Sequence, residues 1–108
     1  MRTVIRATLA GMVLIASTAG LAPAADETRL ERGKRVFVEQ RCQACHAVAG
    51  QGNRRYPLDG VGSRLDAKAL RTWIVAPQEM DPKVRKPAYD DVSATDLDAL
   101  VAYLASLR

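Results

Sequence analysis

The two cysteines and the single histidine of the chain stand together in one five-residue segment, Cys42-Gln43-Ala44-Cys45-His46. Thiols can add to the two vinyl groups on one edge of a porphyrin, and imidazole is a good ligand for the iron at its centre. The pattern C-x-x-C-H is the attachment signature of haem c. It predicts one haem c bound covalently through Cys42 and Cys45, with the iron bound by His46.

Other uses of a C-x-x-C segment fit this chain less well. A thioredoxin-like dithiol is expected at a βαβ unit, and no segment alternates as a strand. Structural zinc needs four ligands, whereas the chain offers two Cys and one His. A disulfide between Cys42 and Cys45 would close a very short loop, and it would leave the adjacent His46 unexplained.

Residues 1–24 predict a cleaved export signal. Arg2 and Arg6 precede an uncharged run from Ala7 to Leu21, and small residues follow at a cleavage site after Ala24. The uncharged run is shorter than the roughly 20 apolar residues of a membrane-spanning helix. We therefore expect a mature domain of residues 25–108 in the periplasm, without stable membrane insertion. Its 14 basic and 12 acidic residues give no argument for nucleic-acid binding.

Helical periodicity predicts an all-α fold. The first helix is expected from Thr28 to about Arg41 and the second over residues 66–75, where Pro77 ends it. Ser93 is the predicted N-cap of a last helix. The apolar stripe of that helix consists of Leu97, Leu100, Val101, Leu104 and Leu107. Residues 47–64 predict an irregular loop, and residues 76–92 predict a proline-rich extended loop.

The order of these elements resembles that of the small monohaem class I cytochromes c over essentially the whole mature chain. The resemblance implies that the first and last helices cross, with Gly33 and Phe37 facing residues 102–104. It also implies that the backbone carbonyl of Pro57 accepts a hydrogen bond from Nδ1 of the haem histidine and so orients the ring.

The sixth iron ligand departs from the family pattern. Where the family usually carries Met-Pro-x-Tyr, this chain has Lys86-Pro87-Ala88-Tyr89. Met80, six residues earlier and outside any apolar stripe, is the first candidate, because His/Met ligation is the cytochrome c pattern. Lys86 is the second, since a lysine shielded from water can lose its proton and bind a metal. An open distal site is the third.

The predicted function is electron transfer between redox partner proteins, without catalysis by the chain itself. A haem subunit of an oxidoreductase complex is an alternative. An open distal site would favour gas binding or sensing. A freestanding peroxidase is disfavoured, because it would need a distal acid–base group and the chain has no second histidine.

Overall fold

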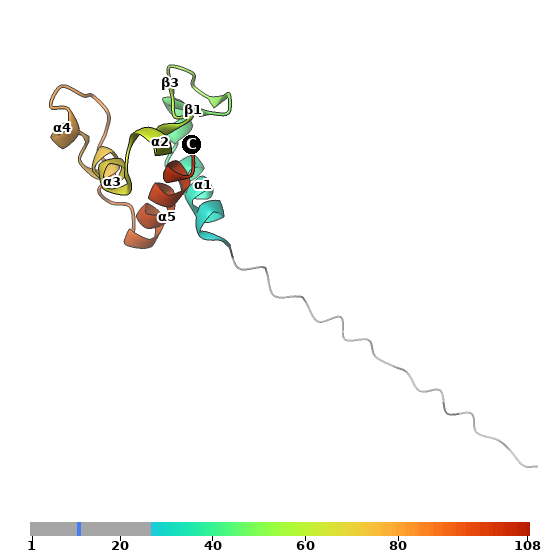
Figure 1. Cartoon of the computed structure of the whole chain (residues 1–108). Coiled ribbons are helices and arrows are strands. Elements are labelled where there is room, and N and C mark those ends of the chain that lie inside the picture. The colour runs from blue at the N-terminus through green and yellow to red at the C-terminus, as the bar shows by residue number, and fades with distance from the viewer. Residues whose placement is uncertain (1–10, 12–26) are drawn as a thin grey trace, which may run out of the picture.

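The computed structural model describes Gly11 and residues 27–108 (Figure 1). The predicted signal peptide, residues 1–24, lies outside the described residues except at Gly11. Among the residues described, no helix is both long enough and apolar enough to cross a membrane.

Helix α1, Arg29–Glu39, begins at a capping box. The Thr28 hydroxyl accepts a hydrogen bond from the Glu31 amide at 3.2 Å, and the Glu31 carboxylate accepts one from the Thr28 amide at 2.8 Å. These bonds satisfy amides that have no partner within the first turn. The helix ends before the predicted Arg41, because Arg41 takes a left-handed conformation with φ of 58°.

The second and last predicted helices are confirmed as α3, Ala67–Val75, and α5, Ala94–Ala105. Asp66 caps α3 by accepting a hydrogen bond from the Ala69 amide at 2.8 Å. Ser93 caps α5, as predicted, by accepting one from the Asp96 amide at 3.2 Å. Both caps use a short polar side chain to satisfy an orphan amide of the first turn.

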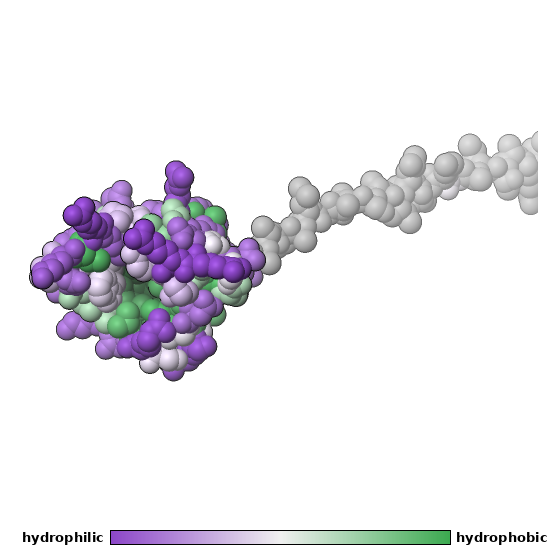
Figure 2. Space-filling model, turned by 90° about the horizontal axis from the view of Figure 1, so that it is seen from above, coloured by the Kyte–Doolittle hydropathy of each residue, from purple (hydrophilic) through white to green (hydrophobic). Residues whose placement is uncertain are grey.

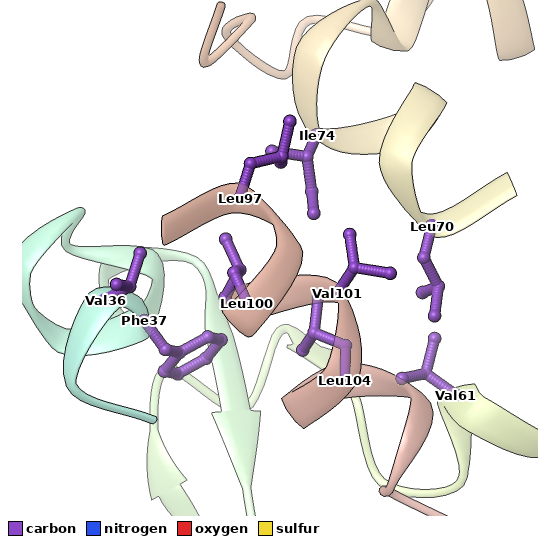
Figure 3. Packing of buried hydrophobic residues seen from close by; sticks show 9 residues of the cluster. All are labelled: Val36, Phe37, Val61, Leu70, Ile74, Leu97, Leu100, Val101 and Leu104. Carbon is purple, nitrogen blue, oxygen red and sulfur yellow. The ribbon is translucent and has the colours of Figure 1, made fainter. Parts of the chain in front are cut away.

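The core forms where α5 passes between α1 on one side and α3 on the other (Figures 1 and 3). The predicted crossing of α1 and α5 is confirmed at Gly33, whose backbone contacts Ala99 and Tyr103. The Phe37 ring packs edge-on against Tyr103, with ring centroids 5.8 Å apart. Nine buried apolar side chains make up the core cluster: Val36, Phe37, Val61, Leu70, Ile74, Leu97, Leu100, Val101 and Leu104.

The prediction of an all-α fold is too simple. The expected loop of residues 47–64 contains strands β2, Gln51–Gly52, and β3, Tyr56–Pro57, and helix α2, Val61–Arg64. With β1, His46–Val48, the strands form a small sheet of order β2-β1-β3. The expected extended loop of residues 76–92 contains the one-turn helix α4, Pro77–Met80. Such short elements show no periodicity that a sequence pattern could reveal.

Candidate haem site

The cysteine pair lies on a tight turn directly after α1. Arg41 turns the chain out of the helix, and the 3₁₀ helix η1, Cys42–Ala44, follows. Cys42 is half-buried, and burial raises the pKa of its thiol, whereas Cys45 is exposed. Neither thiol is in a disulfide. Both sulfur atoms are therefore available to form thioether bonds.

His46 directly follows the cysteine pair and begins β1. Its Nδ1 atom lies 2.8 Å from the carbonyl oxygen of Tyr56 on β3. Because a carbonyl can only accept, Nδ1 carries the proton and donates it to this bond. The lone pair of the neutral ring is then on Nε2, which is the atom available to bind iron. A carbonyl partner of this kind also fixes the ring orientation and increases its basicity.

The acceptor for His46 is Tyr56, so the predicted role of Pro57 is wrong by one residue. The register of the sheet gives the reason. Strands β1 and β3 run parallel with His46 opposite Tyr56 and Ala47 opposite Pro57. The amide of Leu58 then donates to the Ala47 carbonyl at 2.8 Å. The ladder thus places the Tyr56 carbonyl, and not that of Pro57, beside the imidazole.

The loop after β1 folds back onto the cysteine turn. The Asn53 amide donates to the Gln43 carbonyl at 2.9 Å, and its side-chain nitrogen donates to the Ala44 carbonyl at 3.0 Å. Gly52 has φ of 102°, and a Cβ there would lie 2.3 Å from the His46 carbonyl oxygen. The turn-forming composition of Gln51-Gly52-Asn53 predicted a loop but not its closure over residues 42–46.

Apolar side chains that remain partly exposed at the core suit an apolar group. The described residues carry several apolar side chains that touch the core but remain partly exposed. Those outside α5 and the C-terminal end are Cys42, Val48, Leu58, Leu65, Val75, Tyr89 and Val92. On one face of the molecule, apolar residues reach the surface in a hollow between hydrophilic side chains (Figure 2). An apolar cofactor would remove such surface from water.

Lys86 is close enough to Cys42 and Cys45 for charges on their sulfur atoms to affect its pKa. It is half-buried, and its Nζ donates to the Pro87 carbonyl at 3.1 Å and lies 4.8 Å from the centroid of the Tyr89 ring. Burial lowers the pKa of Lys86, and the charges of the Cys42 and Cys45 thiolates act on it in the opposite direction. Burial raises the pKa of Tyr89, and the same two thiolates raise it further.

Met80, the first candidate for the sixth ligand, is the last residue of α4 and is 39 % exposed. It is not among the apolar side chains that pack against the core cluster within the described part of the chain. The charges of Cys42 and Cys45 thus act on Lys86, whereas the Met80 side chain is partly exposed.

Comparison with known proteins identifies the family of this chain. Residues 30–108 match the family model for cytochrome c. The chain is also 37% identical over 91 residues to cytochrome c oxidase subunit 2 of Alkalihalophilus pseudofirmus, with 76% of this chain and 27% of that protein aligned. The chain therefore spans about a quarter of the length of this relative. Because the family match covers most of the chain, it belongs to the cytochrome c family, whose members bind haem c covalently and transfer electrons.

Proposed function

We propose that this cytochrome c is a periplasmic electron carrier with a single haem attached to Cys42 and Cys45 and ligated by His46. The observation that carries the proposal is the bond between His46 Nδ1 and the Tyr56 carbonyl, next to two free thiols. It leaves Nε2 as the free donor of the only histidine in the chain. Thiols and imidazole are the donor set that a haem c requires.

Each residue of the site has a separate task in this proposal. Cys42 and Cys45 anchor the porphyrin edge, so the cofactor cannot exchange. His46 binds the iron, and the Tyr56 carbonyl holds the imidazole in one orientation. The half-buried apolar side chains exclude water and so tune the reduction potential. The haem supplies the one-electron Fe(II)/Fe(III) couple, which no side chain of this chain provides.

Mass spectrometry of protein made with a cytochrome c maturation system tests covalent attachment. We expect the mass of residues 25–108 plus one haem, and acid–acetone extraction should leave the colour on the protein. The double variant Cys42→Ala with Cys45→Ala is the control and should lose its colour on extraction. Haem that leaves the unmodified protein on extraction would overturn the proposal.

The periplasmic location rests on the predicted signal in residues 1–24 and has its own test. Fractionation of a Gram-negative expression host should recover the haem protein in the periplasm, and N-terminal sequencing should begin at Ala25. Replacement of Arg2 and Arg6 by glutamate should retain the protein in the cytoplasm without haem. A mature N-terminus that retains residues 1–24 would contradict cleavage.

A haem subunit of an oxidoreductase complex is the second candidate function. The similarity to a cytochrome c oxidase subunit 2 is the observation that favours it. Mild purification of the tagged chain from its own cells separates the two roles. Stoichiometric partner subunits would support a permanent subunit, whereas a monomeric protein would support a free carrier.

The second axial ligand is part of the proposed function as well. Met80 and Lys86, both in the segment between α3 and α5, are the two candidates considered for it. A ligated iron favours electron transfer, because the metal then keeps its coordination in both oxidation states. Rapid CO binding by the unmodified reduced protein would instead favour gas binding or sensing.

A further inference from the structure

We infer that Lys86, and not Met80, supplies the second axial ligand of the haem. The inference rests on the proposed attachment of haem at Cys42 and Cys45. It follows from two features of the segment between α3 and α5: the partial burial of Lys86 and the contacts that hold its backbone.

Lys86 is set apart from the other basic residues of its segment by burial. Lys83, Arg85 and Pro87 around it are exposed, whereas Lys86 is half-buried. Its amine is held against the Pro87 carbonyl at 3.1 Å and over the ring of Tyr89 at 4.8 Å. Surface lysines normally extend into water. The Lys86 amine contacts a neighbouring carbonyl and an aromatic ring, and it forms no salt bridge within the described residues.

Tyr89 fixes where this amine lies relative to the haem site. The Tyr89 amide donates to the Ile74 carbonyl at 2.9 Å, which anchors the segment to α3. Tyr89 and Cys42 both pack against the same core cluster. The thiolates of Cys42 and Cys45 act electrostatically on both Tyr89 and Lys86. The amine is therefore within electrostatic range of the two cysteines to which the porphyrin would be attached.

Gln78 links α4 to the chain that carries Lys86. Its side-chain nitrogen donates to the Val84 carbonyl at 3.4 Å and to the Lys86 carbonyl at 3.2 Å. The backbone at Lys86 is thus held from α4 on one side and through Tyr89 from α3 on the other. Met80, at the end of the same α4, is 39 % exposed.

Ligation by Lys86 requires a simple exchange at its nitrogen. The ammonium releases one proton to water, gives up its bond to the Pro87 carbonyl and donates the freed lone pair to the iron, with no change in oxidation state. Burial of the amine favours the neutral form that this exchange needs.

Spectra of the purified holo-protein test the assignment without reference to activity. The unmodified oxidised protein should be low-spin and should lack the near-infrared sulfur-to-iron charge-transfer band. Lys86→Ala should lose the low-spin signal at neutral pH and bind CO rapidly once reduced. Lys86→Arg keeps the positive charge but cannot deprotonate, so it should behave like Lys86→Ala. Met80→Leu is the matched control and should leave every spectrum unchanged.

The variant Lys86→Met tests whether a different ligand at the same position can bind the iron. If position 86 faces the iron, a thioether there should restore the low-spin state and create the missing charge-transfer band. Acid titration supplies a further readout: the unmodified protein should lose the low-spin state as the amine regains its proton, and Lys86→Met should resist the same acidification.

Three results would overturn the inference. They are a sulfur-to-iron band in the unmodified protein that disappears in Met80→Leu, a low-spin spectrum that persists in Lys86→Ala, and rapid CO binding by the unmodified reduced protein. In each case haem that resists acid–acetone extraction would show that the proposed attachment still stands. Extractable haem would mean that the attachment itself has failed.

Discussion

Gly33 on α1 and Ala99 on α5 meet backbone to backbone. A Cβ at position 33 would lie 2.1 Å from the Ala99 carbonyl oxygen and 2.6 Å from the Tyr103 Cβ. No side chain fits there unless one helix moves. Glycine inside a helix costs about 1 kcal/mol relative to alanine, and at this position the close approach of two helices offsets that cost.

The substitution Gly33→Leu should therefore destabilise the holo-protein by about 1–3 kcal/mol or more, because the larger side chain overpacks the crossing. Thermal or urea unfolding followed by absorbance and circular dichroism measures the loss. Lys34→Leu, the same new side chain on the exposed face of α1, is the control and should change stability little. Equal stability of the two variants would mean that the helices do not need this contact.

Gly52→Ala should weaken the loop that closes over the haem motif. The backbone φ of 102° disfavours any residue with a Cβ, and that atom would also lie 2.3 Å from the His46 carbonyl oxygen. We expect a loss of more than about 2 kcal/mol in urea unfolding. Gly50→Ala is a matched control, with φ of 78° but its nearest contact, Arg54 Nη2, 3.7 Å away. The Gly50→Ala variant should lose only about 1 kcal/mol of unfolding free energy. A larger loss in Gly50→Ala than in Gly52→Ala would mean that the loop does not close over the haem motif.

Stability should fall in acid partly through Asp96. Its hydrogen bond from Arg32, at 2.7 Å, lowers the pKa of the Asp96 carboxylate. A lowered folded-state pKa gives stability that is present above the unfolded value and lost as the pH falls through the folded value. Asp96→Asn should therefore show a smaller loss of unfolding free energy between pH 5 and pH 2 than the unmodified protein does.

Because this pair is partly exposed, with 40% and 27% of the two side chains accessible, added salt should reduce the effect. Asp90→Asn is the control, since Asp90 forms no ion pair within residues 27–108. It should leave the acid dependence close to that of the unmodified protein. Identical curves for Asp90→Asn and Asp96→Asn would mean that Arg32 does not act on Asp96.

The apo-protein should be largely unfolded. Nine buried apolar side chains form a small core, and domains of this size are marginal without a cofactor or disulfide. Far-UV circular dichroism of Cys42→Ala with Cys45→Ala, after its haem has been extracted, should show much less helix than the holo-protein. His46→Ala, which keeps both thiols, serves as the comparison for the loss of iron ligation alone. A cooperative unfolding transition in the double variant would contradict the expectation.

The helices could be predicted because their signals are local. Ser93 precedes Leu97, Leu100, Val101 and Leu104 at helical spacing, and the structure caps and buries these residues as expected. Pro77 also marks the end of α3 correctly, although it starts α4 as well, since proline fits the first turn of a helix. Residues that shape the chain over one or two turns leave a pattern in the sequence.

The parts that could not be predicted depend on contacts between distant residues. The choice of Tyr56 over Pro57 is set by the strand register of His46 and Tyr56, which are ten positions apart, and no sequence periodicity predicts it. The inward turn of Lys86 depends on Gln78 and Tyr89. The C-x-x-C-H segment was predictable as a motif, but the residues that hold it in place were not.

The contact between α1 and α5 also determines when the domain can fold during synthesis of the chain. Arg32 and Asp96 are 64 positions apart, and closing a loop of that length costs about 4 kcal/mol in chain entropy. Synthesis delivers the N-terminal end first, so residues 29–46 are complete while α5 does not yet exist. During that interval α1 has no partner to pack against, and the domain can close only once α5 has been made.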